Sequence, residues 1–125
     1  MRKIKFRCWD KVEKRILYHF NIASYDGVIQ DIELPYGLKW EGRVMSENKG
    51  EDFILMQYTG LLDRNKKEIY EGDIIQGNEK QPNEVFWSEC SWMINQDEVS
   101  FDMLSEFNKE MEIIGNIYSN PELIK

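Results

Sequence analysis

The chain has 125 residues, a mass of 15.0 kDa and a formal net charge of −7. Hydrophobic residues make up 42% of it and aromatic residues 13%, which is enough apolar material for a folded domain and excludes a wholly disordered chain. No apolar run approaches the ~20 residues of a membrane-spanning helix and no apolar segment follows the basic first residues as in a signal peptide, so we expect a cytoplasmic protein with no membrane partner.

The first third of the chain has the pattern of short antiparallel strands. Apolar and basic residues alternate over 4–8, a polar turn follows at 10–14, and a second alternating segment covers 15–21. Alternation with a period of two on both sides of a polar turn predicts a β-hairpin. Gly27 then precedes a further expected strand at 28–32.

Residues 35–52 differ in composition from the segments on either side. They contain one proline, three glycines and a run of polar residues, which is typical of a long connection. We interpret them as a soft boundary inside a single domain of 1–125. The boundary separates an N-terminal hairpin part, 1–34, from a barrel-like part, 53–125.

The apolar pattern becomes denser after residue 53. Residues 53–58 have the composition of a buried strand that Thr59 and Gly60 end, and a polar reversal is expected at 63–67. The remaining expected elements are strands beginning at Ile74, at 84–87, at 91–94 and at 112–118, and one short helix at 101–107. Many short strands with one helix predict a mainly β fold, in which an N-terminal hairpin subdomain accompanies a small bent sheet or SH3-like barrel.

The sequence contains none of the nucleotide-binding or nucleophile motifs that identify common enzyme classes. The only histidine is His19, at a position of surface parity in an expected strand, where a general base is not favoured. Cys8 and Cys90 together with His19 provide fewer than the four ligands of a structural zinc site. We therefore expect no catalytic residue, no cofactor and no bound metal, and we expect both cysteines to be reduced.

Three carboxylates lie close together in sequence, at Glu68, Glu71 and Asp73. Such a group can hold a divalent cation or act as an acid/base pair. However, Gly72 separates the last two, and a glycine between turn-favouring polar residues indicates a tight turn with a positive φ angle. We favour the turn over the catalytic pair.

Tryptophans at 87 and 92 fall on neighbouring expected strands. Aromatic side chains on a barrel face can stack nucleobases, but that mode of binding needs a basic groove beside them. Here the neighbouring charged residues are acidic and repel phosphate. We therefore expect no nucleic-acid partner, and we interpret Trp87 and Trp92 as core or interface residues.

Three segments in chain order carry a family resemblance. They are residues 2–10 (RKIKFRCWD), 56–75 (MQYTGLLDRNKKEIYEGDII) and 113–123 (IIGNIYSNPEL). These segments resemble the signatures of the YopX family, whose members are encoded by phages and prophages. The resemblance implies a β-rich fold with a barrel-like C-terminal part and an accessory protein of phage type in a bacterial host cell. It implies no activity, cofactor or site residue.

The chain departs from the family pattern at two positions. Lys66 stands where the family commonly has glycine, so we expect either a different turn type or a left-handed conformation at Asn65. Cys8 stands where a small residue such as alanine is common, which is a further argument against a role as a metal ligand.

The leading functional hypothesis is a non-enzymatic binding or protein-interaction module. Its basis is the segment at 71–75, EGDII, which resembles the start of a strand in SH3-like barrels, a fold that serves mainly as a binding platform. The alternatives are a small hydrolytic enzyme built on the three carboxylates and an acidic mimic of nucleic acid. A charge of −7 is modest for such a mimic, and the basic N-terminus argues against it. The residues assigned to interaction or structure are Glu71, Gly72, Asp73, Trp87 and Trp92.

Charge is spread unevenly along the chain. Residues 1–15 hold seven basic and two acidic side chains, a local +5, whereas 84–125 hold two basic and nine acidic ones, a local −7. This asymmetry is most simply that of a domain that neutralises itself, but it can also steer a partner.

Four tryptophans, six tyrosines and six phenylalanines are a large aromatic content for the interior of a small barrel. We therefore expect a homo-oligomer, weakened by salt, whose interface buries at least one tryptophan, and a host or phage protein is a further possible partner. The four candidate tryptophans are Trp9, Trp40, Trp87 and Trp92.

Overall fold

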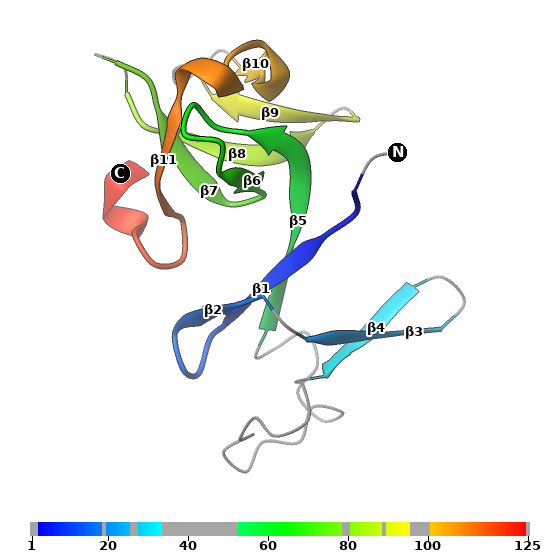
Figure 1. The fold of residues 1–125 in the computed structure, drawn as a ribbon. Helices are drawn as coiled ribbons and strands as arrows, with labels where there is room; N and C mark the ends of the chain where they lie inside the picture. Colours follow the sequence, from blue (N-terminus) through cyan, green and yellow to red (C-terminus); the bar gives the residue numbers. More distant parts are fainter. Residues whose placement is uncertain are drawn as a thin grey trace. The chain divides into compact units, whose positions relative to one another are not determined.

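Antiparallel strands make up most of the residues that the structure, a computed structural model, describes (Figure 1). The described residues are 3–18, 20–25, 28–33, 53–78, 81–88, 90–95 and 101–124. The chain divides into two compact units. We call residues 1–6 with 56–125 the barrel unit and residues 7–55 the hairpin unit. The mainly β fold expected from the sequence is confirmed, while the expected connection at 35–52, His19 and Trp40 lie outside the described residues.

The strands in chain order are β1 (Phe6–Asp10), β2 (Arg15–Leu17), β3 (Asn21–Tyr25), β4 (Val28–Glu33), β5 (Phe53–Leu62), β6 (Glu68–Tyr70), β7 (Asp73–Gln76), β8 (Asn83–Ser88), β9 (Ser91–Asn95), β10 (Phe101–Met103) and β11 (Glu112–Asn116). Three short 3₁₀ helices accompany them in the described part of the chain: η1 (Leu104–Glu106), η2 (Asn108–Glu110) and η3 (Pro121–Ile124). None of the helices among the described residues is long and apolar enough to cross a bilayer.

The hairpin unit contains the β-hairpin predicted from the N-terminal alternation. Strand β1 pairs antiparallel with β2, and Cys8 lies opposite Leu17. The second strand is shorter than expected, because it ends at Leu17. Cys8 and Phe53 form a small buried cluster, against which the partly buried Leu17, Phe20 and Leu55 pack. Strands β3 and β4 form a second antiparallel pair, and β4 confirms the strand expected at 28–32.

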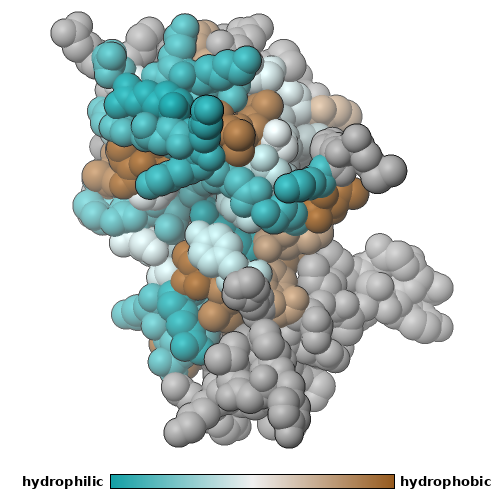
Figure 2. All heavy atoms as spheres, in the orientation of Figure 1, coloured by the Kyte–Doolittle hydropathy of each residue, from teal (hydrophilic) through white to brown (hydrophobic). Residues whose placement is uncertain are grey.

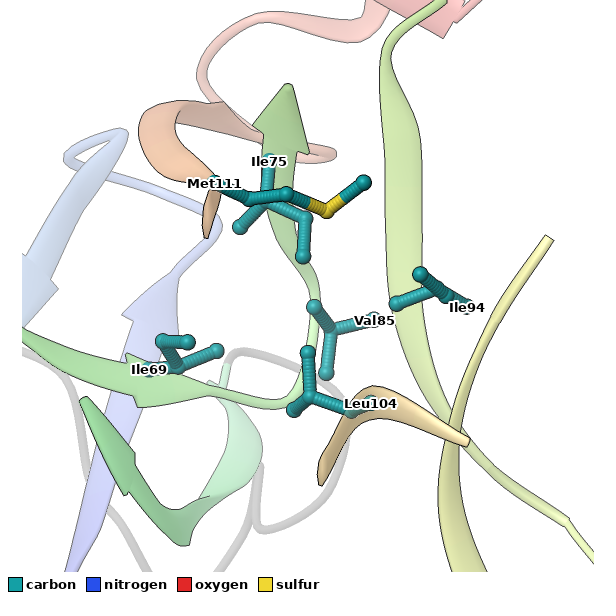
Figure 3. Close-up of a cluster of buried hydrophobic side chains, with 6 residues drawn as sticks. All are labelled: Ile69, Ile75, Val85, Ile94, Leu104 and Met111. Carbon is teal, nitrogen blue, oxygen red and sulfur yellow. The ribbon is translucent and has the colours of Figure 1, made fainter. Parts of the chain in front are cut away.

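The barrel unit is built around a curled antiparallel sheet with the strand order β10-β9-β8-β7-β11 (Figure 1). Strand β6 of this unit pairs antiparallel with β5, with Tyr58 opposite Tyr70. Six side chains from β6, β7, β8, β9, η1 and the residue before β11 form the core of the barrel unit (Figure 3): Ile69, Ile75, Val85, Ile94, Leu104 and Met111. Each is almost fully buried, so each contributes about 1.5–3 kcal/mol of transfer free energy.

Strand β5 does not end at Thr59 and Gly60, as the sequence suggested. It continues to Leu62, and its register with β6 shifts between Tyr58 and Leu62. Gly60 has a φ angle of 88°, and the hydroxyl of Thr59 donates a hydrogen bond to the carbonyl of Ile69, 2.7 Å away. A bulge of this kind bends a strand without ending it.

The segment expected to form one helix at 101–107 is instead strand β10 followed by η1. The first three residues of the segment, 101–103, pair with β9 and are therefore extended, with Met103 opposite Met93. The i, i+3, i+6 spacing of Phe101, Leu104 and Phe107 fits a 3₁₀ helix, with three residues per turn, as well as it fits an α-helix.

The polar reversal at 63–67 is present between β5 and β6. Its positive φ angle, 64°, belongs to Lys66, so the left-handed conformation considered for Asn65 is wrong. Lys66 therefore adopts the conformation for which glycine is best suited.

Candidate functional site

Glu68, Glu71 and Asp73 each contact a different partner in the barrel unit. Both carboxylate oxygens of Glu68 accept hydrogen bonds from Lys5 Nζ, at 2.9 and 2.8 Å. Glu71 Oε1 accepts from the backbone amide of Gln57 at 3.4 Å. Asp73, which is 1% exposed, accepts from the amide of Tyr70 at 2.8 Å. These contacts hold strands and turn together, and they support the structural interpretation of the three carboxylates.

Gly72 lies in the turn between β6 and β7 with a φ angle of 86°, which confirms the conformation predicted for it. Its amide donates to the carbonyl of Val85 and its carbonyl accepts from the amide of Ile117, both at 2.9 Å. The turn therefore connects the start of β7 to β8 and to the segment after β11.

The two cysteines occupy different environments and are not bonded to each other. Cys8 is buried in the hairpin unit, and Cys90 is exposed after β8. Within the described part of the chain, no three His, Cys, Asp or Glu side chains lie close enough together to hold a metal ion.

We expect the two thiols to differ strongly in reactivity. Burial, and secondarily the charge of Asp10, raises the pKa of the Cys8 thiol to about 12, so at pH 8 only about one part in ten thousand is the reactive thiolate. A chromogenic disulfide reagent should titrate one thiol per native chain and two per unfolded chain. The Cys90→Ser variant should show none in the native state. Rapid reaction of two thiols in the native protein would contradict the burial of Cys8.

Among the described residues of the barrel unit, the most exposed aromatic side chain lies on the β8–β9 hairpin. Trp87 lies directly opposite Trp92 in the register, and their ring centroids are 4.9 Å apart with an interplanar angle of 69°. Trp92 also packs against the core cluster, whereas 54% of the surface of Trp87 is exposed. The edge-to-face contact with an anchored neighbour therefore holds an exposed indole in place.

The other face of the same hairpin is also apolar. Side chains alternate between the two faces of a strand, so Val85 and Trp87 share the core side and Phe86 lies on the opposite one. Phe86 is paired with Met93, and both are half-buried. We call the group Phe86, Trp87, Trp92 and Met93 the aromatic hairpin. The two tryptophans were expected from the sequence, whereas Phe86 and Met93 join them only through the observed pairing of β8 with β9.

Glu84 is the acidic residue of β8. Burial raises the pKa of the Glu84 carboxyl, and the nearby negative charge of Glu71 raises it further. Figure 2 shows hydrophilic side chains over much of the described part of the visible face, with smaller hydrophobic patches between them. A hollow of about 270 Å³ is lined by Gly77, Asn78, Phe107, Glu110 and Met111, and its one ionisable side chain, Glu110, is exposed. We take the aromatic hairpin, with its exposed indole held against Trp92, as the candidate site.

The curled sheet and the exposed aromatic hairpin belong to a small, mainly β protein. The family model "YopX protein" matches residues 5–125, and the chain belongs to the YopX family. The resemblance found in the three sequence segments is thereby confirmed.

Two crystal structures are similar to this chain over its whole length. Protein EF1440 from Enterococcus faecalis is 26% identical with a TM-score of 0.62, and protein yopX from Bacillus subtilis is 21% identical with a TM-score of 0.68. Each comparison covers 100% of both chains. A comparison with curated proteins found no match. The likeness to yopX supports the fold.

Proposed function

We propose that this protein is a non-enzymatic protein-interaction module and that the aromatic hairpin is its contact surface. The most direct support is the exposure of Trp87. Its indole contacts the anchored Trp92 edge-to-face, yet 54% of the surface of Trp87 is exposed to solvent. Tryptophan is enriched at the centres of protein interfaces, where a large and rigid side chain fills a pocket of the partner. An indole that is already fixed loses little entropy on binding.

The setting of the proposed module is the bacterial cytoplasm during phage or prophage life. The family resemblance supports the connection to phages, and the two solved relatives come from bacteria. The partner is a protein of the phage, of the host or of both. The separate partners of Glu68, Glu71 and Asp73 support a non-enzymatic role, because each carboxylate is engaged in holding the fold.

Site-specific photo-crosslinking in living cells tests this proposal. A photoreactive phenylalanine analogue replaces Trp87 in the tagged protein, which is expressed in lysogenic or infected bacteria. The control places the same analogue at Ile124, an apolar residue of the same unit that is 37% exposed. We expect illumination to yield a defined protein adduct from position 87 and at least several-fold less from position 124. No adduct, or equal adducts from both positions, would rule out the hairpin as the contact surface.

A further inference from the structure

We infer that the aromatic hairpin binds the turn between β1 and β2 of a second copy of this chain. The inference rests on the proposed function and names the partner of the same surface. Its basis is the chemical complementarity between two exposed parts of the chain: an aromatic hairpin in the segment of excess negative charge, and an apolar side chain flanked by lysines.

The second of these parts is the turn at residues 11–15, which we call the basic turn. Its sequence is Lys-Val-Glu-Lys-Arg, and Lys11, Lys14 and Arg15 are exposed. Val12 is 52% exposed at the tip of a hairpin, where a polar residue is the usual occupant. A projecting aliphatic side chain between cations suits a partner surface that is both apolar and acidic.

The shape of the basic turn is fixed before binding. The fully buried carboxylate of Asp10 accepts hydrogen bonds from the amides of Val12 and Glu13, at 3.0 and 3.2 Å, and lies 3.6 Å from Arg15 Nε. The carbonyl of Asp10 accepts from the amide of Lys14 at 2.8 Å. Because these contacts order the turn in the free chain, binding it has a small entropic cost.

The aromatic hairpin has the complementary chemistry. Tryptophan is the best aromatic acceptor for a cation over its face, and a lysine brings an apolar stem together with its charge. Glu84 lies near the start of β8, two residues before Phe86, and therefore shares the strand face of Phe86, and residues 84–125 carry a local charge of −7. The segment with the opposite excess, a local +5 over residues 1–15, contains the basic turn.

Trp87 and Val12 are each exposed to solvent in the single chain, at 54% and 52%. Each copy carries both halves of the contact. Two copies that exchange turns make a closed, isologous dimer, and copies joined head to tail make longer assemblies. Either arrangement satisfies the expectation that an interface buries a tryptophan.

Light scattering on the purified full-length chain tests the inference. In low salt the mass should rise above 15.0 kDa with protein concentration, and added salt should weaken association because it screens exposed charges. Trp87→Ser should weaken self-association about tenfold or more, as the loss of a central interface tryptophan does. A second variant that combines Lys11→Glu with Val12→Asp should do the same from the other half. Ile124→Ser is the control and should associate like the wild type.

Mixing the two weakened variants provides the decisive measurement. One chain then contributes an intact aromatic hairpin and the other an intact basic turn, so a 1:1 complex of about 30 kDa, twice the 15.0 kDa of one chain, should return at high protein concentration. Thermal melts establish beforehand that both variants are folded. A mixture that stays at 15.0 kDa, or a wild-type chain of 15.0 kDa at every concentration, overturns the inference. If crosslinking from position 87 nevertheless captures a different protein, the proposed function stands and only the second copy is excluded.

Discussion

Replacing Asp63 with alanine should lower the free energy of unfolding by about 3 kcal/mol or more. The side chain is 3% exposed, and its two carboxylate oxygens accept three backbone hydrogen bonds. One oxygen accepts from Asn65 and Lys67 at 2.8 and 2.9 Å, and the other from Ile113 at 3.0 Å. Removal of the carboxylate leaves three backbone amides without this acceptor, and each unsatisfied group costs about 1–3 kcal/mol where water cannot replace the bond.

The effect should extend beyond one turn, because Asp63 joins the β5–β6 turn to β11. The amide of Arg64 donates to the carbonyl of Met111, and the guanidinium of Arg64 pairs with Glu112 at 2.9 Å. These neighbouring contacts depend on the same arrangement of the turn. The ion pair is partly exposed, so we expect the buried carboxylate to account for most of the loss.

Urea unfolding followed by fluorescence measures this change. Asp63→Asn is the matched variant, since it keeps one acceptor oxygen but directs an NH₂ group at a backbone donor, and it should lose an intermediate amount of stability. Asn65→Ala removes only an exposed contact to Glu112 and should stay within about 0.5 kcal/mol of the wild type. An Asp63→Ala protein as stable as that control would mean that water replaces the carboxylate.

The sequence predicted the fold best where turn chemistry and strand alternation agree. The reversal at 63–67 and the turn at Gly72 have turn-forming residues between apolar runs, and both are present as expected. The β8–β9 hairpin was predicted in the same way and ends in a Ser88–Ser91 pair. In these segments the information that determines the structure is local in sequence.

The predictions failed where pairing with a distant strand decides the conformation. Gly60 was expected to end a strand, but β5 continues because Leu62 still lies opposite Glu68 of β6. Residues 101–103 were expected to be helical and instead pair with β9. A glycine or a three-residue spacing is compatible with either outcome, and only the neighbouring strand selects one.

The candidate site was also predictable only where the determining residues are close in sequence. Alternation placed Trp87 and Trp92 on adjacent strands, and they do contact each other. Which of the two is exposed was not predictable, because Val85 and Trp87 have the same parity, and only the extent of the core separates the buried side chain from the exposed one. Likewise the partners of Glu68 and Glu71 are Lys5 and the amide of Gln57, which lie 63 and 14 positions earlier in the chain.

Replacing Gly72 with valine should lower the free energy of unfolding by about 3 kcal/mol, and with alanine by about 1–2 kcal/mol. A φ angle of 86° is strained for any residue with a Cβ atom, and most of all for a β-branched one. The added Cβ would lie 3.2 Å from the sulfur of Met56 and 3.5 Å from the ring of Tyr118. The backbone cannot rotate away freely, because its amide and carbonyl bind Val85 and Ile117.

Gly60 provides a matched control for this measurement, because its φ angle of 88° is nearly the same but its position is exposed. Gly60→Ala should show the cost of backbone strain alone, about 1 kcal/mol, and Gly72→Ala should exceed it by the cost of crowding Met56. Differential scanning calorimetry on both variants separates the two contributions. If the Gly72→Val variant has the same melting temperature as the wild type, the turn does not need a residue in the left-handed conformation. If Gly72→Ala matches Gly60→Ala, the crowding costs nothing, and strain alone explains the glycine.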